Sequence, residues 1–144
     1  MLTPRQNLML AALSGAGEHA TYTPVQVQKL FFLIDREAAA YVNGPHFDFK
    51  PYDYGPFDRA VYDELEYLTR IGLTETVQGI RTRLYMLTSE GYAIGVNELT
   101  RFPTNIQDFI KRCAIWVRSL SFQQLVAAIY NKYEDMRVNS VFRE

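Results

Sequence analysis

Side chains that could bind a metal ion come closest together at His46-Phe47-Asp48, with Asp53 shortly after. A protein zinc site needs three or four such ligands in a fixed geometry. The two or three ligands available here are of mixed type and stand in a predicted loop, and His19 lies between predicted helices with no obvious partner. We therefore interpret His46 as a surface histidine and predict no metal site.

Nucleophilic catalysis also has little support in the sequence. Cys113 is the one cysteine and stands at an apolar position of a predicted helix, which indicates a buried structural thiol. A single cysteine excludes an internal disulfide. The sequence contains neither a phosphate-binding glycine loop nor a nucleophile elbow. We predict no catalytic residue, no cofactor and no enzyme activity.

Length and charge favour one compact protein with no overall attraction for polyanions. The 144 residues suffice for one domain with its own core. The formal net charge is −1, so binding to nucleic acid or anionic lipid would need a local basic patch. The apolar run from Leu8 to Leu13 is shorter than the ~7–15 residues of a signal-peptide core, and no stretch approaches the ~18 apolar residues of a membrane span. We expect a cytoplasmic protein that binds no membrane.

Four segments carry the signature of a helix start. In such a capping box a Ser or Thr hydroxyl accepts a hydrogen bond from the third helical residue, and a glutamine side chain there bonds back to the cap. The four segments are Thr3-Pro4-Arg5-Gln6, Thr23-Pro24-Val25-Gln26, Thr104-Asn105-Ile106-Gln107 and Ser121-Phe122-Gln123-Gln124.

The helix predicted from Thr23 has a wide apolar face. Phe32 and Leu33 lie beside its main stripe, so we expect the helix to be buried on two sides or to meet a partner. The main stripe follows helical spacing for four turns and consists of Val27, Leu30, Phe31, Ile34, Ala38 and Tyr41.

The elements that follow have the order of a winged helix. A helix at 57–71 with Gly72 as its stop precedes two strands joined near Gly79, at 74–78 and 82–87. A further helix runs to Leu99, and two amphipathic helices follow it. We predict a mainly α, winged-helix-like domain with a small β-hairpin wing and two extra C-terminal helices. Residues 1–144 are expected to form a single domain, with a winged-helix-like core at 1–99 and a helical extension at 100–144 packed on it.

The charge of helix 57–71 bears on DNA binding, because the helix before the wing enters the major groove in winged helices that read DNA. It carries four carboxylates against two arginines, a net charge of −2. Carboxylates facing phosphates are repelled and reduce counterion release, which supplies most non-specific affinity. Nucleic acid is therefore disfavoured as a partner. In the alternative interpretation, Arg59, Arg81 and Arg83 bind DNA phosphates rather than being solvated surface cations.

Seven aromatic residues fall between Tyr41 and Tyr62, and they admit two interpretations. They either pin an irregular loop to the core or form a rigid surface with the composition of interface hot spots. We expect Gly55-Pro56 to set the turn into the following helix, with Pro56 at or near its first position. The candidate partner-binding residues are Tyr52, Tyr54, Gly55, Pro56, Phe57 and Tyr62.

Three short motifs together resemble the Panacea-domain proteins, the SocA-like, phage-associated antitoxin group. They are Val27-Gln28-Lys29-Leu30-Phe31-Phe32-Leu33, Tyr52-Asp53-Tyr54-Gly55-Pro56-Phe57 and Val61-Tyr62. In that family a Gln-Lys-Leu helix precedes a Tyr-Gly-Pro turn and a Val-Tyr helix, and the match spans roughly residues 23–73. Residues 84–91, Leu-Tyr-Met-Leu-Thr-Ser-Glu-Gly, also resemble the wing strand and following helix of PadR-like and MarR-like regulators. The C-terminal segment 129–142 departs from the Panacea pattern.

The resemblance implies a small bacterial or phage protein that neutralises a toxin or acts as an adaptor. We therefore predict a non-enzymatic protein-binding module, an antitoxin or proteolytic adaptor of the Panacea type. Its partner would be a protein, either a toxin or a component of a protease system. The alternative is a winged-helix DNA-binding transcriptional regulator.

Overall fold

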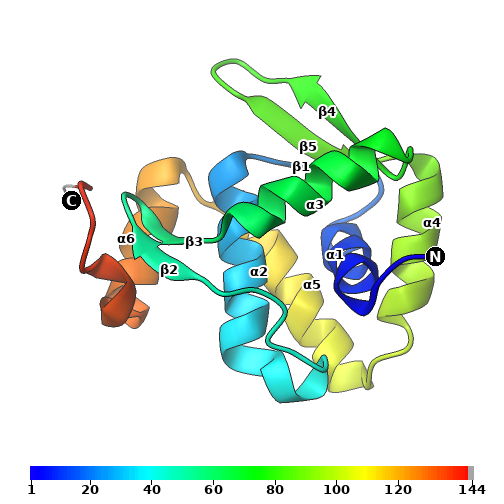
Figure 1. Cartoon of the computed structure of the whole chain (residues 1–144), viewed down its shortest axis with the longest axis horizontal. Helices are drawn as coiled ribbons and strands as arrows, with labels where there is room; N and C mark the ends of the chain where they lie inside the picture. The colour runs from blue at the N-terminus through cyan, green and yellow to red at the C-terminus, as the bar shows by residue number, and fades with distance from the viewer. Residues whose placement is uncertain (143–144) are drawn as a thin grey trace.

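The computed structural model describes residues 1–142 as a small α+β domain that is 58% helical, with six α-helices and a small antiparallel sheet (Figure 1). Two short 3-10 helices extend the second and last α-helices: η1 (Ala39–Tyr41) and η2 (Glu134–Arg137). The α-helices are α1 (Pro4–Ser14), α2 (Pro24–Ala38), α3 (Arg59–Arg70), α4 (Ser89–Leu99), α5 (Thr104–Ser119) and α6 (Phe122–Lys132).

Local capping chemistry explains most of the helix starts. The predicted capping box is confirmed at α1, α2 and α6, where the caps are Thr3, Thr23 and Ser121. The prediction is wrong for α5, because Thr104 is already helical and Pro103 occupies the cap without a side-chain acceptor. Gln107 bonds to the carbonyl oxygens of Thr100 and Phe102 instead.

The three-stranded sheet contains the predicted hairpin. Strands β4 (Thr74–Gln78) and β5 (Arg83–Leu87) pair in antiparallel register, and Thr74 lies opposite Leu87. The short strand β1 (Thr21–Tyr22) pairs with the other edge of β5, which gives the order β1-β5-β4. The two strands predicted about Gly79 are thereby confirmed.

Helix α2 lies at the centre of the fold and is covered from several sides. It contacts α1, α3, α5 and α6, and Figure 1 shows it running beside α5. Phe32 and Leu33 are buried, at 2% and 7% exposure. The rings of Phe49 and Tyr133 pack edge-on against Phe32. The wide apolar face from Val27 to Ala38 is therefore covered within the chain. The prediction was wrong for Tyr41, which lies in η1, beyond the end of α2, and is 62% exposed.

The aromatic segment forms a second hairpin that sequence reasoning did not predict. Strands β2 (Lys50–Tyr52) and β3 (Gly55–Phe57) pair in antiparallel register, with Pro51 opposite Pro56. The prediction of an irregular loop up to Pro56 was wrong at this point. Proline cannot donate to a ladder, so a segment with two prolines reads as non-strand, although the edges of a two-stranded hairpin tolerate both.

Helix α3 also begins later than predicted. Pro56 and Phe57 belong to β3, so the expected helix start at about Phe57, with Pro56 at or near its first position, was wrong. Asp58 has an extended backbone, and its carboxylate accepts a 2.8 Å hydrogen bond from the N–H of Ala60. The helix therefore starts after an aspartate cap, which satisfies an N–H that would otherwise lack a partner.

Candidate functional site

The buried side chain of Gln28 joins α2 to the beginning of α3. Its Nε2 donates to the carbonyl oxygen of Asp58, and its Oε1 accepts from the N–H of Asp58, both at 3.0 Å. Gln28 is only 1% exposed. The carboxylate of Asp58 additionally accepts from the N–H of Asp48 at 2.7 Å. The junction between β3 and α3 is thus held by polar contacts whose loss would leave backbone groups unpaired.

Lys29, the next residue, lies beneath the β2–β3 turn and is 3% exposed. Its Nζ donates to the carbonyl oxygen of Pro56 at 3.3 Å. Within residues 1–142 no carboxylate lies at ion-pair distance from this amine. Burial lowers the pKa of Lys29 from 10.5 to about 7, because the charged form has lost its water. A buried lysine of this kind is unusual in a region with no paired acid.

Gly55 permits the tight turn and lies against Lys29. Its φ is +105°, a conformation that residues with a side chain rarely adopt. A Cβ added here would lie 3.4 Å from Cε and Nζ of Lys29 and 3.5 Å from the ring of Tyr130. These are ordinary contact distances, so a longer side chain extending in this direction would press against Lys29 or Tyr130.

Above this buried layer lies an aromatic surface formed by Tyr52, Tyr54, Phe57, Tyr62 and Phe122. Tyr52, Tyr54 and Phe122 remain 54%, 45% and 44% exposed, respectively. Ring contacts link Phe57 to Tyr52 at 5.2 Å and to Tyr62 at 5.7 Å, and Tyr54 to Phe122 at 5.1 Å. These rings hold each other in place while large parts of them face solvent.

The aromatic surface surrounds a hollow of about 290 Å³. Tyr62 is fixed at its wall, because its hydroxyl donates to the carbonyl oxygen of Pro24 at 3.3 Å. Burial raises the pKa of Tyr62 to about 12, so the phenol stays protonated as a donor. Besides the five aromatic residues, the hollow is lined by Pro24, Val25, Gln28, Lys29, Asp53 and Gly55.

The C-terminal segment reinforces the turn of the hairpin. The carbonyl oxygen of Asp53 accepts from the N–H of Val141 at 3.0 Å and from the hydroxyl of Ser140 at 3.2 Å. Asn139 donates to the carbonyl oxygen of Pro51 at 3.3 Å. In Figure 1 this segment and α6 lie beside the β2–β3 hairpin, at the end of the molecule opposite α4. The β2–β3 turn is therefore held by a part of the chain more than eighty positions further along.

The predicted partner-binding residues divide into aromatic rings that are at least partly exposed and two turn residues that are buried. Tyr52 and Tyr54 are exposed, and Phe57 and Tyr62 are half-buried. Gly55 and Pro56 are buried, so they shape the turn beneath the rings. Sequence reasoning did not include Phe122, Gln28 or Lys29. One signal was available for Lys29, which lies three and four positions before Phe32 and Leu33 and therefore on the widened apolar face of α2.

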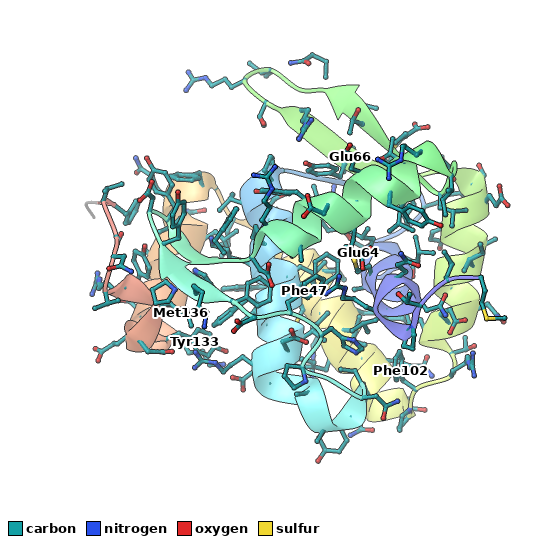
Figure 2. All side chains as sticks on the ribbon, viewed as in Figure 1. Phe47, Glu64, Glu66, Phe102, Tyr133 and Met136 are labelled. Atoms are coloured by element: carbon teal, nitrogen blue, oxygen red, sulfur yellow. The ribbon has the colours of Figure 1, made fainter. Side chains whose placement is uncertain are left out.

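The carboxylates of α3 do not all face solvent. Glu64 points toward α1, whereas Glu66 lies on the side of α3 that faces the β4–β5 hairpin (Figure 2). Glu64 accepts from Arg5 at 2.7 Å and from Gln6 at 3.1 Å, and its side chain is 13% exposed. The net charge counted along the sequence therefore overstates the acidity of the outer face.

The outer face of α3 is electrically balanced by pairs one turn apart. Arg59 pairs with Asp63 at 3.7 Å, and Arg70 pairs with Glu66 at 3.2 Å. These four side chains and Arg83 line a hollow of about 480 Å³ between α3 and the sheet.

Arg81 lies elsewhere, beside a second hollow next to the start of α2 and of α6. The structure thus brings Arg59 and Arg83 to one hollow together with two acids. Arg81 does not line that hollow.

The residues considered for metal or thiol chemistry have structural partners. The ring Nε2 of His46 lies 2.7 Å from the carbonyl oxygen of Val42, and Asp48 pairs with Lys50. Across the part of the chain that the structure describes, no group of three or more His, Cys, Asp or Glu side chains could hold a metal ion. Cys113 is buried as predicted, and burial raises the pKa of its thiol to about 12. Within residues 1–142 no helix has the length and apolar character needed to cross a bilayer.

Comparison with protein-family models, with curated proteins and with solved structures finds no match to this chain.

Proposed function

We propose that this chain is a non-enzymatic protein-binding module built on a winged-helix-like core. Apart from η1 and the β2–β3 hairpin, which lie between α2 and α3, the element order up to the sheet is α1-β1-α2-α3-β4-β5. This order and the sheet order β1-β5-β4 support such a core, because a winged helix combines three helices with a strand and a terminal hairpin in this order. Helices α5 and α6 are then additions that cover α2. Fold alone does not define a function, so the proposal rests on the aromatic surface.

The single observation that carries the proposal is an exposed aromatic surface on a rigid base. Tyr52, Tyr54 and Phe122 are about half exposed, yet each ring is held by a neighbouring ring. Binding through such rings costs little conformational entropy, because they are already ordered. Aromatic residues of this kind are enriched among interface hot spots. Exposed, ordered aromatic rings therefore favour a protein as the partner over a polyanion.

Within this proposal, the partner is a toxin or a component of a protease system, as for antitoxins and adaptors of the Panacea type. The resemblance to that family rests on a Gln-Lys-Leu helix and a Tyr-Gly-Pro turn. These two motifs are in contact here: Lys29 bonds to Pro56, and Gln28 bonds to Asp58, the residue directly after the turn motif. Contact between the motifs supports treating them as one physical unit that presents the rings of Tyr52 and Tyr54.

A DNA-binding regulator is the weaker candidate. Arg81 and Arg83 are exposed on the β4–β5 hairpin and are the feature that favours it. The groove-reading helix of such a protein needs unpaired cations on its outer face. The arginines of α3 are instead paired with Asp63 and Glu66.

A growth assay tests the proposal. The reading frame next to the gene is expressed alone and together with this chain in a bacterial host. We expect its product alone to arrest growth and co-expression to restore it. Tyr54→Ser should abolish the rescue, whereas Tyr41→Ser, which changes a tyrosine 62% exposed and outside the aromatic surface, should retain it. A harmless neighbour that does not bind the chain would count against the antitoxin role.

A further inference from the structure

We propose that the hollow within the aromatic surface binds a carboxylate of the protein partner, with the amine of Lys29 as its counter-ion. This inference rests on the proposed protein-binding function and specifies the chemistry of the segment that is bound. The ligand is a carboxylate attached to an apolar group, either a Glu or Asp side chain next to an apolar residue or the C-terminal carboxylate of the partner.

The position and bonding of Lys29 give the first argument. A lysine ammonium carries three donors. Within the described residues the amine donates one hydrogen bond, to the carbonyl oxygen of Pro56 at 3.3 Å. Lys29 nevertheless lines the hollow that opens between the aromatic rings. The remaining donor capacity is therefore available to an acceptor that enters this hollow.

The size and walls of the hollow select the ligand. A volume of about 290 Å³ lies at the lower limit of small-molecule pockets, so it suits a single side chain or chain end. One cation matches a monoanion, whereas a phosphate group generally takes several cationic donors. The walls are rings of Tyr54, Phe57, Tyr62 and Phe122, which favour an apolar group beside the anion. Because Lys29 is only 3% exposed, little water screens its charge, and this strengthens the charge interaction.

The other titratable groups around Lys29 do not replace such a ligand. From the hairpin, Asp53 lines the same hollow but is half exposed, so water screens its repulsion of an incoming carboxylate. Tyr54 and Tyr62 line the wall. From α6, Tyr130 lies beneath Gly55. The guanidinium carbon of Arg137 lies over the ring of Tyr130, 5.3 Å from its centroid.

The protonation of Lys29 makes binding dependent on pH. Burial brings the pKa of the free amine to about 7, and a bound carboxylate favours the ammonium and therefore raises that pKa. Affinity for a carboxylate should be greatest below pH 7 and should fall as pH rises from 7 toward the pKa of the complex. A neutral ligand of the same shape should show no such dependence.

The experiment is an NMR titration of the full chain with three probes: N-acetyl-phenylalanine, its C-terminal amide, and acetyl-phenylalanyl-glutamate amide. Chemical shifts of the Gly55 amide and of a ¹³Cε-labelled Lys29 report binding and the lysine pKa. At pH 6.5 we expect at least one of the two acids to bind about tenfold more tightly than the neutral amide, a difference of about 1.4 kcal/mol. The first acid represents a chain terminus and the second a side chain, so their ratio identifies the source. The preference should shrink about tenfold by pH 8.5, and the acid should raise the pKa of Lys29.

Lys29→Met should abolish the preference for the acid without changing the affinity for the amide, and Lys111→Met, at an exposed site on α5, should leave both unchanged. If Lys29→Met does not fold, the rise in the lysine pKa on adding acid to the wild-type chain decides the question. Equal binding of acid and amide, no binding of either acid, or an unchanged lysine pKa would overturn the inference. Partner binding that survives Lys29→Met but is lost in Tyr54→Ser would overturn it too, while leaving the proposed function intact.

Discussion

The side-chain amide of Gln28 pairs with both backbone polar groups of Asp58, thirty positions further along the chain. This pairing resembles one rung of a β-ladder and joins α2 to the point where β3 becomes α3. Because Asp58 also caps α3, this glutamine is bound at the position where the aromatic hairpin ends and the helix begins. The neighbouring Lys29 supports the same hairpin from below.

Replacing Gln28 should destabilise the fold. Gln28→Leu keeps the buried volume but leaves the N–H and C=O of Asp58 without their partner, which should cost about 1–3 kcal/mol in the free energy of unfolding. Urea denaturation measures this loss, and Gln123→Leu, at an exposed position of α6, is the control. Equal stability of Gln28→Leu and wild type would mean that the hydrogen bonds between Gln28 and Asp58 do not contribute to the free energy of unfolding.

Gly55→Val should also destabilise the protein, by about 1–3 kcal/mol, because a β-branched side chain resists a positive φ. Gly72→Val is a matched control: Gly72 has a φ of +83°, but no atom lies within 4 Å of an added Cβ. The loss at Gly55 should exceed that at Gly72, since the longer side chain meets Lys29 and Tyr130. Thermal unfolding of both variants makes the comparison. A melting temperature of Gly55→Val equal to that of wild type would show that the turn does not require glycine at this position.

Local signals allowed most of the helices to be predicted. Thr3 and Thr23 cap their helices through residues three positions away, so the sequence carries the whole interaction. Thr104 shows the limit of the same signal, because the preceding Pro103 takes the cap position. The β2–β3 hairpin was not predicted, because a proline disfavours a strand. This hairpin contains two, Pro51 and Pro56, which lie opposite each other.

Long-range partners could not be predicted from spacing. From the sequence, Glu64 was counted with the acidic outer face of α3. Its contact with Arg5, fifty-nine positions earlier in the chain, places it against α1 instead. The contacts of Gln28 with Asp58 and of Lys29 with Pro56 span 30 and 27 positions. Tyr54 could be named as a candidate from composition alone, but its neighbour Phe122 comes from a distant helix. A binding surface assembled from several elements is therefore only partly visible in the sequence.

The stability of the protein should rise with pH between 7 and 8.5. The folded pKa of Lys29, about 7, lies below its ordinary value of 10.5, so in this range the unfolded chain binds more protons than the folded chain. The penalty for burying the amine is fully present below pH 7 and decreases as pH rises, by at most about 1.4 kcal/mol per pH unit. Urea denaturation across this range should show a gain of up to about 2 kcal/mol that is absent in Lys29→Met and retained in Lys111→Met. The same slope in Lys29→Met and in wild type would mean that Lys29 keeps its ordinary pKa.

DNA binding should be weak and insensitive to the hairpin arginines. The cations of α3 are already paired, so few phosphates can be neutralised. A gel-shift series with duplex DNA from low to moderate salt should show no salt-dependent complex, and Arg81→Ala with Arg83→Ala should change nothing. Tight binding that weakens steeply with salt and is lost in this double variant would favour the regulator instead.

Binding of a protein through the aromatic surface can be measured by calorimetric titration with the purified product of the adjacent reading frame. We expect a complex whose Kd rises at least about thirtyfold, or about 2 kcal/mol, in Tyr52→Ser with Tyr54→Ser. Tyr41→Ser should change the Kd by no more than about twofold, since surface substitutions outside an interface have small effects. An unchanged Kd in the double tyrosine variant would contradict the claim that these rings bind the partner.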